Sequence, residues 1–167
     1  MTKLVDCTTI QSMMFTRYIQ SELQDALQPG RAVILLGARR VGKTTLIHNV
    51  IDETSQRVAF FNCDDPDVRN QFTDVGLHTL KRMFTDVDMI VFDEAQRIKN
   101  IGITLKLIID EMPNKKLLVS GSSSLELSNQ INEPITGRKK TFQLFPLSVL
   151  ELWNQEHKQE LSVRSHL

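Results

Sequence analysis

Glycine, lysine and threonine residues follow the first apolar run of the chain at a spacing that could bind phosphate. Residues 37–44 read Gly-Ala-Arg-Arg-Val-Gly-Lys-Thr and fit the pattern G-x-x-x-x-G-K-[ST]. In this pattern the glycines let backbone N–H groups point inward at phosphate oxygens, and the following helix adds its unpaired N–H donors. Lys43 would reach the outer phosphates of a nucleotide, and Thr44 would give its hydroxyl oxygen to Mg²⁺. The predicted nucleotide-binding residues are Gly37, Ala38, Arg39, Arg40, Val41, Gly42, Lys43, Thr44 and Thr45.

Two acidic residues, Asp93 and Glu94, follow the apolar run at residues 89–92. An aspartate at the carboxyl end of a buried strand lies where open α/β sheets place their ligands, and there it can hold the hydration shell of Mg²⁺. Glu94 could accept a proton from, or orient, the water that attacks a γ-phosphate. The alternatives are a helix N-cap for Asp93 and a solvated acid in the first helical turn for Glu94.

Five short apolar runs predict strands that are buried on both faces of a sheet. They cover residues 32–36, 58–61, 89–92, 116–120 and 141–145. The stretches between them are long enough for helices, and one is clearly periodic from Ile101 to Met112 before Pro113 ends it. Asp65 and Pro66 predict the capped start of another helix. Strands that alternate with helices predict a parallel sheet and an α/β fold.

The length and composition indicate one globular domain over residues 1–167, since 41% of the residues are hydrophobic. Twenty basic and twenty acidic residues balance, so no net charge draws the chain to nucleic acid or to an anionic membrane. No apolar run is long enough to span a membrane and the start lacks the core of a signal peptide, so we expect a cytoplasmic protein. The expected parts are an N-terminal segment at 1–28 with a helix over 14–27 packed on the sheet, a nucleotide-binding core at 31–150 and a polar tail at 151–167.

The order of these motifs resembles that of P-loop ATPases that carry a catalytic glutamate after the magnesium-binding aspartate. This resemblance implies a three-layer P-loop NTPase fold with a parallel sheet of about five strands in the order 5-1-4-3-2. It also implies that the strand at residues 116–120 aims Ser120 at the γ-phosphate, where a hydroxyl could hold the attacking water. The alternative is that Ser120 and the serines at 122–124 make a turn and cap the next helix.

Two other classes of P-loop protein are disfavoured by the residues. A GTPase would carry an Asn-Lys-x-Asp motif after a strand, but Asn114 and Lys115 precede a strand and Leu117 stands at the aspartate position. A complete helicase needs a second lobe, for which 167 residues leave no room. ATP with Mg²⁺ is therefore the expected nucleotide.

As a set, the motifs resemble the prokaryotic AAA-like ATPases whose nucleotide-binding domain precedes a C-terminal domain of unknown function. The resemblance runs through GARRVGKTTL, FFNCDDPDVR, MIVFDEAQRI, LLVSGSSSLEL and ITGRKKTFQLFPLSVLEL. Members of that family continue beyond the last of these segments, so we expect this chain to lack the C-terminal domain. A homo-oligomer or a protein partner could bind through that absent portion.

The sequence leaves two roles open for Arg39, Arg40 and Arg138. Members of the family carry an Ala-Gly-Arg or similar triplet before the Pro-Leu-Ser segment, and residues 136–138 match it. By this resemblance Arg138 would stabilise charge in the transition state, either within the chain or from a neighbouring subunit. Its alternative is ordinary solvation beside the two lysines that follow it. Arg39 and Arg40 could contact a triphosphate or lie solvated at the rim of the loop.

The leading hypothesis is a Mg²⁺-dependent ATP-binding domain that also hydrolyses ATP. Its predicted catalytic residues are Glu94, Ser120 and Arg138, and its predicted metal ligands are Thr44 and Asp93. The alternative is an ATP-gated interaction module that switches a partner with little hydrolysis. A third hypothesis is DNA binding through the arginines and lysines of the loop and of residues 138–140, against which the neutral net charge argues.

Overall fold

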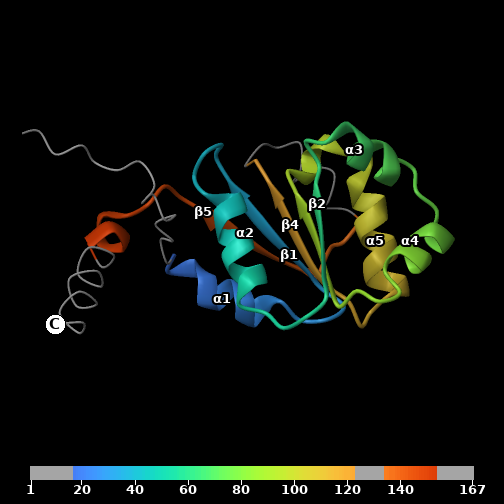
Figure 1. Ribbon diagram of the computed structural model, residues 1–167, viewed down its shortest axis with the longest axis horizontal. Coiled ribbons are helices and arrows are strands. Elements are labelled where there is room, and N and C mark those ends of the chain that lie inside the picture. Colours follow the sequence, from blue (N-terminus) through green and yellow to red (C-terminus); the bar gives the residue numbers. More distant parts are fainter. Residues whose placement is uncertain (1–16, 123–133, 154–167) are drawn as a thin grey trace, which may run out of the picture. The chain divides into compact units, whose positions relative to one another are not determined.

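The computed structural model describes residues 17–122 and 134–153, and its centre is a sheet of five parallel strands (Figure 1). The strands are β1 (Ala32–Gly37), β2 (Val58–Asn62), β3 (Met89–Asp93), β4 (Lys116–Gly121) and β5 (Lys139–Leu144). Their order across the sheet is β2-β3-β4-β1-β5, and each neighbouring pair runs parallel. Counted from the other edge this is the order 5-1-4-3-2, so the predicted sheet is confirmed.

Helices cover both faces of this sheet and complete the predicted three layers (Figure 1). They are α1 (Ile19–Ala26), α2 (Lys43–Asp52), α3 (Pro66–Phe72), α4 (Leu77–Met83), the 3₁₀ helix η1 (Ala95–Arg97) and α5 (Ile101–Glu111). Successive residues of a strand point to opposite faces. Ala32, Ile34 and Leu36 therefore pack with α3, α4 and α5, whereas Val33 and Leu35 pack with α1 and α2.

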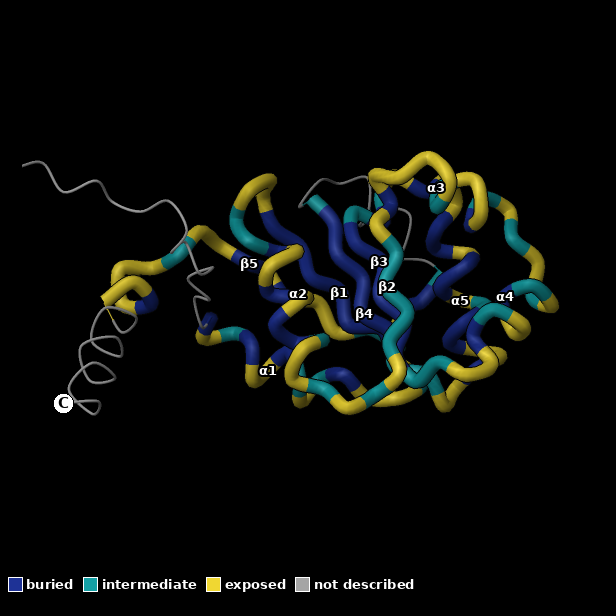
Figure 2. Tube along the Cα trace, in the orientation of Figure 1, coloured by how far each residue is buried: buried dark blue, intermediate teal, exposed yellow. Residues whose placement is uncertain are grey.

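The strands differ in how far they are buried (Figure 2). β1 and β3 are buried along their whole length, and β4 is buried after its first residue. β2 is only half-buried, and β5 alternates between buried and exposed residues over its second half. The prediction that all five strands are buried on both faces is therefore wrong for β2 and β5, because these two strands form the edges of the sheet.

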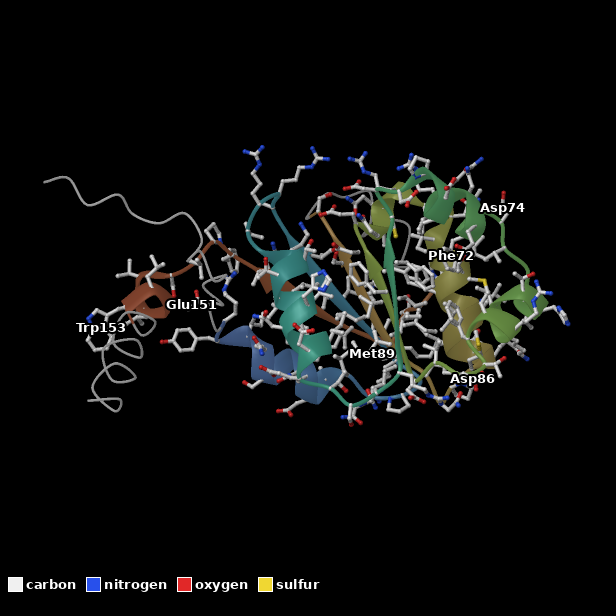
Figure 3. The ribbon with its side chains drawn as sticks, in the orientation of Figure 1. Phe72, Asp74, Asp86, Met89, Glu151 and Trp153 are labelled. Carbon is white, nitrogen blue, oxygen red and sulfur yellow. The ribbon has the colours of Figure 1, made fainter. Side chains whose placement is uncertain are left out.

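Local signals place the ends of two helices as expected. Asp65 caps α3 by accepting a hydrogen bond from the N–H of Asp67 at 2.9 Å, and Pro66 is the first helical residue. α5 ends at Glu111, two residues before Pro113. Phe72, at the end of α3, lies between the layers with its ring centroid 4.7 Å from that of Phe61 and 4.9 Å from that of Phe92 (Figure 3).

The N-terminal helix is shorter than predicted. Within the described residues it starts at Ile19, and Leu23 and Leu27 are buried against the sheet as expected. Tyr18 precedes the helix and its side chain is 59% exposed, so its predicted place on the packed face is wrong. The predictions for residues 14–16, for the serines at 123–124 and for the tail at 154–167 lie outside the described residues.

Contacts divide the chain into two units, residues 19–146 and residues 1–18 with 147–167. In the described part of the second unit, Ser148 and Glu151 form a capping box at a short helix. The Glu151 N–H donates to Ser148 Oγ at 3.2 Å, and the Ser148 N–H donates to Glu151 Oε2 at 2.8 Å. Glu151 Oε1 also accepts a hydrogen bond from Arg17 Nε at 3.0 Å. The single domain over residues 1–167 stays a prediction.

Candidate functional site

The loop between β1 and α2 has the backbone that an anion-binding loop requires. Gly42, directly before α2, has a φ of 94°, and Arg40 also adopts a left-handed conformation with a φ of 66°. At Gly37 a Cβ atom would lie 2.7 Å from the carbonyl oxygen of Leu144 in β5, so only glycine fits without movement. Gly42 is the N-cap residue of α2 and has no side chain with which to cap it. The first N–H groups of this ten-residue helix therefore remain available to an anion.

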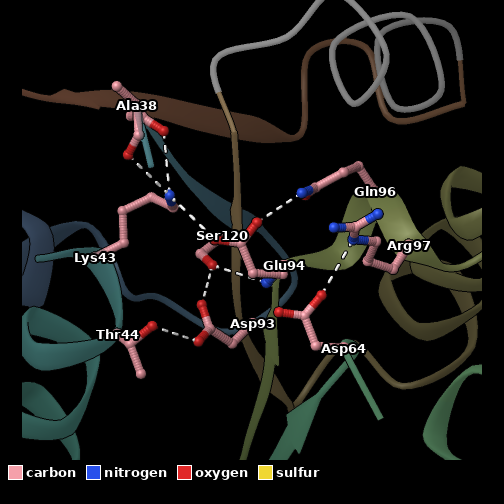
Figure 4. A network of polar contacts seen from close by, with 10 residues as sticks. Ala38, Lys43, Thr44, Asp64, Asp93, Glu94, Gln96, Arg97 and Ser120 are labelled. Atoms are coloured by element: carbon pink, nitrogen blue, oxygen red, sulfur yellow. Dashed lines mark hydrogen bonds and ion pairs between the residues drawn. The ribbon is translucent and has the colours of Figure 1, made fainter. Parts of the chain in front are cut away.

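Lys43 lies inside this loop and is 4% exposed. Its ammonium donates to the carbonyl oxygens of Gly37 at 3.1 Å and Ala38 at 3.2 Å, and it forms an ion pair with Glu94 Oε1 at 3.1 Å (Figure 4). An ammonium has three N–H donors, so these three contacts satisfy it. A phosphate oxygen can therefore bind Lys43 only by displacing one of them.

The two predicted magnesium ligands lie side by side. Thr44 Oγ1 donates a hydrogen bond to Asp93 Oδ2 at 2.6 Å, although the two residues are 49 positions apart in the sequence (Figure 4). Asp93 ends β3 and is 3% exposed, and Thr44 lies in the first turn of α2. Mg²⁺ is usually held by only one or two protein oxygens together with water and phosphate oxygens. Thr44 and Asp93 fit that requirement.

Glu94 is held by two partners and by an unusual backbone. Its φ of 55° is left-handed, and its Oε2 accepts a hydrogen bond of 2.6 Å from Gln96 Nε2 while Lys43 pairs with Oε1. Burial raises the pKa of this carboxyl, but the hydrogen bonds from Gln96 and Lys43 outweigh it, and the pKa lies below its ordinary value. Glu94 is therefore ionised at neutral pH.

Ser120 contacts both acidic residues, and its predicted catalytic role stays a prediction. Its side chain is fully buried, and its hydroxyl donates to Asp93 Oδ1 and accepts a hydrogen bond from the Glu94 N–H at 3.0 Å. The hydroxyl is thus engaged by Asp93 and by the backbone of Glu94. The reason is the register of β4 beside β3, in which Val119 lies opposite Phe92 and Ser120 therefore comes level with Asp93. In this position Ser120 links the side chain of Asp93 to the backbone of Glu94.

Arg138 lies at the other end of the sheet from the loop. Its carbonyl oxygen accepts a hydrogen bond of 3.0 Å from the N–H of Ala32, the first residue of β1, and its side chain forms an ion pair with Asp110 of α5. β1 runs six residues from Ala32 to Gly37, which separates its ends by about 17 Å at roughly 3.3 Å per residue. This geometry argues against a role for Arg138 at the site of its own chain.

The remaining predicted residues lie around the loop. Ala38, Arg39, Arg40 and Thr45 are exposed, and Val41 is half-buried.

One residue of the site was not predicted: Gln96, which holds Glu94. Its signal was the Asp-Glu-Ala-Gln string itself, because a residue two positions after Glu94 in a tight turn can reach back to it. In the residues that the structure covers, no group of three or more His, Cys, Asp and Glu side chains could hold a metal ion.

The neighbouring Cys63 is a structural thiol. It is fully buried at the end of β2, where its N–H donates to the carbonyl oxygen of Asp93 at 2.9 Å. Burial, together with the nearby acidic side chains, raises the pKa of the Cys63 thiol to about 12. It therefore stays protonated and is a poor nucleophile.

Comparisons with known proteins agree with this architecture. A family model for AAA domains, AAA_14, matches residues 29–153. A search of curated proteins found no match to the sequence. Over the residues that the structure describes, no helix has the length and apolar character needed to cross a bilayer.

Three solved structures resemble the chain. A Walker-type ATPase of Pyrococcus abyssi has a TM-score of 0.64 and 20% identity, over 90% of this chain and 59% of that one. The RuvB Holliday junction branch migration motor of Thermotoga maritima has a TM-score of 0.56 and 19% identity, over 82% and 47%. The P-loop NTPase domain of a sigma-54 transport activator from E. coli has a TM-score of 0.51 and 17% identity, over 77% and 93%.

At these identities the solved structures show the fold alone, and this chain spans only 59% of the length of the Pyrococcus protein. The family match covers most of the sequence and includes both the loop and the acidic pair. The family and the P-loop NTPase fold support nucleotide binding as the class of function. The chain belongs to the family of AAA domains.

Proposed function

We propose that this chain binds ATP with Mg²⁺ through the loop at residues 37–45 and hydrolyses it with Glu94. One observation carries the proposal: Lys43 and Thr44 from the loop contact Glu94 and Asp93 from the end of β3. An ammonium, a hydroxyl and two carboxylates thus converge beside the N–H groups at the start of α2, which lack partners within the helix. Such a set suits an anionic nucleotide and a hard cation.

In this proposal each residue has a separate task. The loop N–H groups and Lys43 bind phosphate oxygens, and Thr44 and Asp93 hold Mg²⁺. The bound cation would offset negative charge on the phosphates. Glu94, ionised and next to the loop, would orient the attacking water and accept its proton. Ser120 would keep Asp93 and the backbone of Glu94 in register.

ATP binding with and without Lys43 tests the proposal. Lys43→Ala removes the ammonium, and we expect its affinity for Mg-ATP to fall by at least about tenfold, because charge-assisted contacts to phosphate are lost. Lys106→Ala is the matched control, since Lys106 is an exposed lysine on α5. Isothermal titration calorimetry measures both variants. Equal affinity of Lys43→Ala and the unmodified protein would exclude the proposed site.

A second function, an ATP-gated switch with little hydrolysis, is favoured by the state of Glu94. Both of its carboxylate oxygens are engaged, by Lys43 and by Gln96, so contacts within the chain hold the proposed base. Single-turnover assays with protein in excess over ATP separate the two functions. Phosphate release supports the ATPase, whereas tight ATP retention without release supports the switch.

Partners and location remain proposals of the same kind. Arg138 could act only on the site of a neighbouring subunit, and that role requires a homo-oligomer. DNA binding has less support, because Arg138 is paired with Asp110 and Lys140 Nζ lies 3.1 Å from Glu22 Oε1. A salt-dependent affinity for DNA would be its minimum test. We also propose a protein partner and a cytoplasmic location, as the sequence predicts.

A further inference from the structure

Gln96 has a dedicated contact in the site. Its Nε2 donates to Glu94 Oε2 at 2.6 Å, and this is the one hydrogen bond that its side chain makes among the described residues. Its other amide atom, Oε1, is buried and has no partner in that part of the chain. An ionised carboxylate can only accept hydrogen bonds, so the Gln96 amide must turn its Nε2, and not its Oε1, towards Glu94.

The element that carries Gln96 is firmly anchored. Only Glu94 separates η1 from β3, and Ala95 and Ile98 on either side of Gln96 and Arg97 are fully buried. Arg97 Nε donates to Asp64 Oδ1 at 3.1 Å and ties η1 to the loop after β2 (Figure 4). The amide of Gln96 is therefore presented to Glu94 by a rigid turn.

The two partners of Glu94 differ in what happens to them when nucleotide binds. This step rests on the proposed function, in which Lys43 turns to phosphate. All three donors of Lys43 are engaged in the structure, so binding phosphate weakens its hold on Glu94 or on a loop carbonyl. Among the residues that the structure describes, the Gln96 amide makes no hydrogen bond to the phosphate-binding loop, so its hold on Glu94 does not compete with phosphate.

We propose that Gln96 is a positioning residue that keeps the Glu94 carboxylate in its working orientation after Lys43 has turned to the nucleotide. Glu94 has several rotatable bonds and faces the negative charge of a triphosphate once Lys43 is occupied. Without the amide, its carboxylate would swing away from the phosphates. A displacement of about 1 Å at a reacting group can lower a rate by roughly a hundredfold.

The test replaces Gln96 by methionine, which has a similar length but no N–H donor. For Gln96→Met we expect the dissociation constant for Mg-ATP to stay within about twofold of that of the unmodified protein and the single-turnover rate of hydrolysis to fall by roughly tenfold or more. Lys99→Met is the control, since it changes an exposed side chain just after the same 3₁₀ helix and should leave the rate nearly unchanged. A normal rate in Gln96→Met, or an equal loss in both variants, would overturn the proposal.

A crystal structure of the unmodified protein with a non-hydrolysable ATP analogue and Mg²⁺ would test the Gln96–Glu94 contact directly, without a measurement of hydrolysis. The proposal expects Gln96 Nε2 still bonded to Glu94 when Lys43 contacts phosphate, and an amide turned away from Glu94 contradicts it. Failure of the proposed function looks different. In that case Lys43→Ala binds Mg-ATP as well as the unmodified protein does, whatever the state of Gln96.

Discussion

Replacing Glu94 by glutamine should separate nucleotide binding from hydrolysis, and it should tighten binding. Glu94→Gln keeps the size of the side chain and removes its negative charge. The structure shows that this charge pairs with Lys43, the residue that phosphate must also use. The variant therefore loses a competitor for Lys43 and, in the proposed function, also loses the base. ATP should bind more tightly and phosphate release should nearly stop.

The size of the effect follows from the ion pair. Lys43 Nζ lies 3.1 Å from Glu94 Oε1, and the two side chains are 4% and 17% exposed. At an effective dielectric constant of about 20, the Coulomb attraction at that distance is about 5 kcal/mol. Desolvation of both groups offsets most of it, which leaves a net contribution of about 1 to 2 kcal/mol. Removing this competing contact should lower the dissociation constant of ATP roughly 5- to 30-fold.

Calorimetry with Mg-ATP measures the affinity, and single-turnover phosphate release measures the chemistry. Glu111→Gln is a suitable control, because Glu111 makes an ion pair with Lys81 at 3.0 Å on the exposed surface of α5. That variant should change neither quantity. Weaker ATP binding by Glu94→Gln would refute the idea that Glu94 competes with phosphate, and undiminished phosphate release would remove Glu94 from its catalytic role.

Three further outcomes follow from the contacts. Gly37→Ala should lower the free energy of unfolding by about 1 to 3 kcal/mol in urea titrations, because its Cβ would lie 2.7 Å from a β5 carbonyl oxygen. Ser120→Ala should reduce the rate of phosphate release more than ATP affinity, because Asp93 and Glu94 lose a shared hydrogen-bond partner. Arg57 lowers the pKa of Asp88 from 3.8 to about 2, so this pair stabilises the fold above the unfolded pKa and its contribution is lost as the pH falls through about 2. Asp88→Asn should therefore unfold at lower urea than the unmodified protein at neutral pH, and the two should converge near pH 2.

The fold was predictable from the sequence because its signals are local. Each apolar run ends at a polar or turn residue, the loop pattern links β1 to α2, and Asp65 with Pro66 marks the start of α3. Burial was predicted less well, since a run such as residues 58–61 has the same composition at an edge as at the centre of a sheet. Only the strand order tells which strands lack a neighbour.

The positions of Lys43, Thr44 and Asp93 were predictable because local sequence patterns mark the end of β3, where Asp93 lies, and the start of α2, where Lys43 and Thr44 lie. The hydrogen-bond partners of Ser120 were not predictable, because the sequence does not show which neighbouring group a hydroxyl will contact. Ser120 stands at the expected strand end, yet its hydroxyl turns sideways to the next strand because Asp93 lies level with it. The motif around Arg138 identified a residue type, but the parallel register placed that residue at the far end of β1.

The left-handed backbone at Glu94 connects the fold to the proposed chemistry. Successive residues of a strand point to opposite faces, so Asp93 and Glu94 could not both reach the loop from a continuous β3. The φ of 55° at Glu94 ends the strand and brings its carboxylate to Lys43 while Asp93 meets Thr44. A non-glycine residue in this conformation costs about 1 to 2 kcal/mol. The contacts of Glu94 with Lys43, Gln96 and Ser120 offset that cost, and they hold its carboxylate and backbone beside the loop.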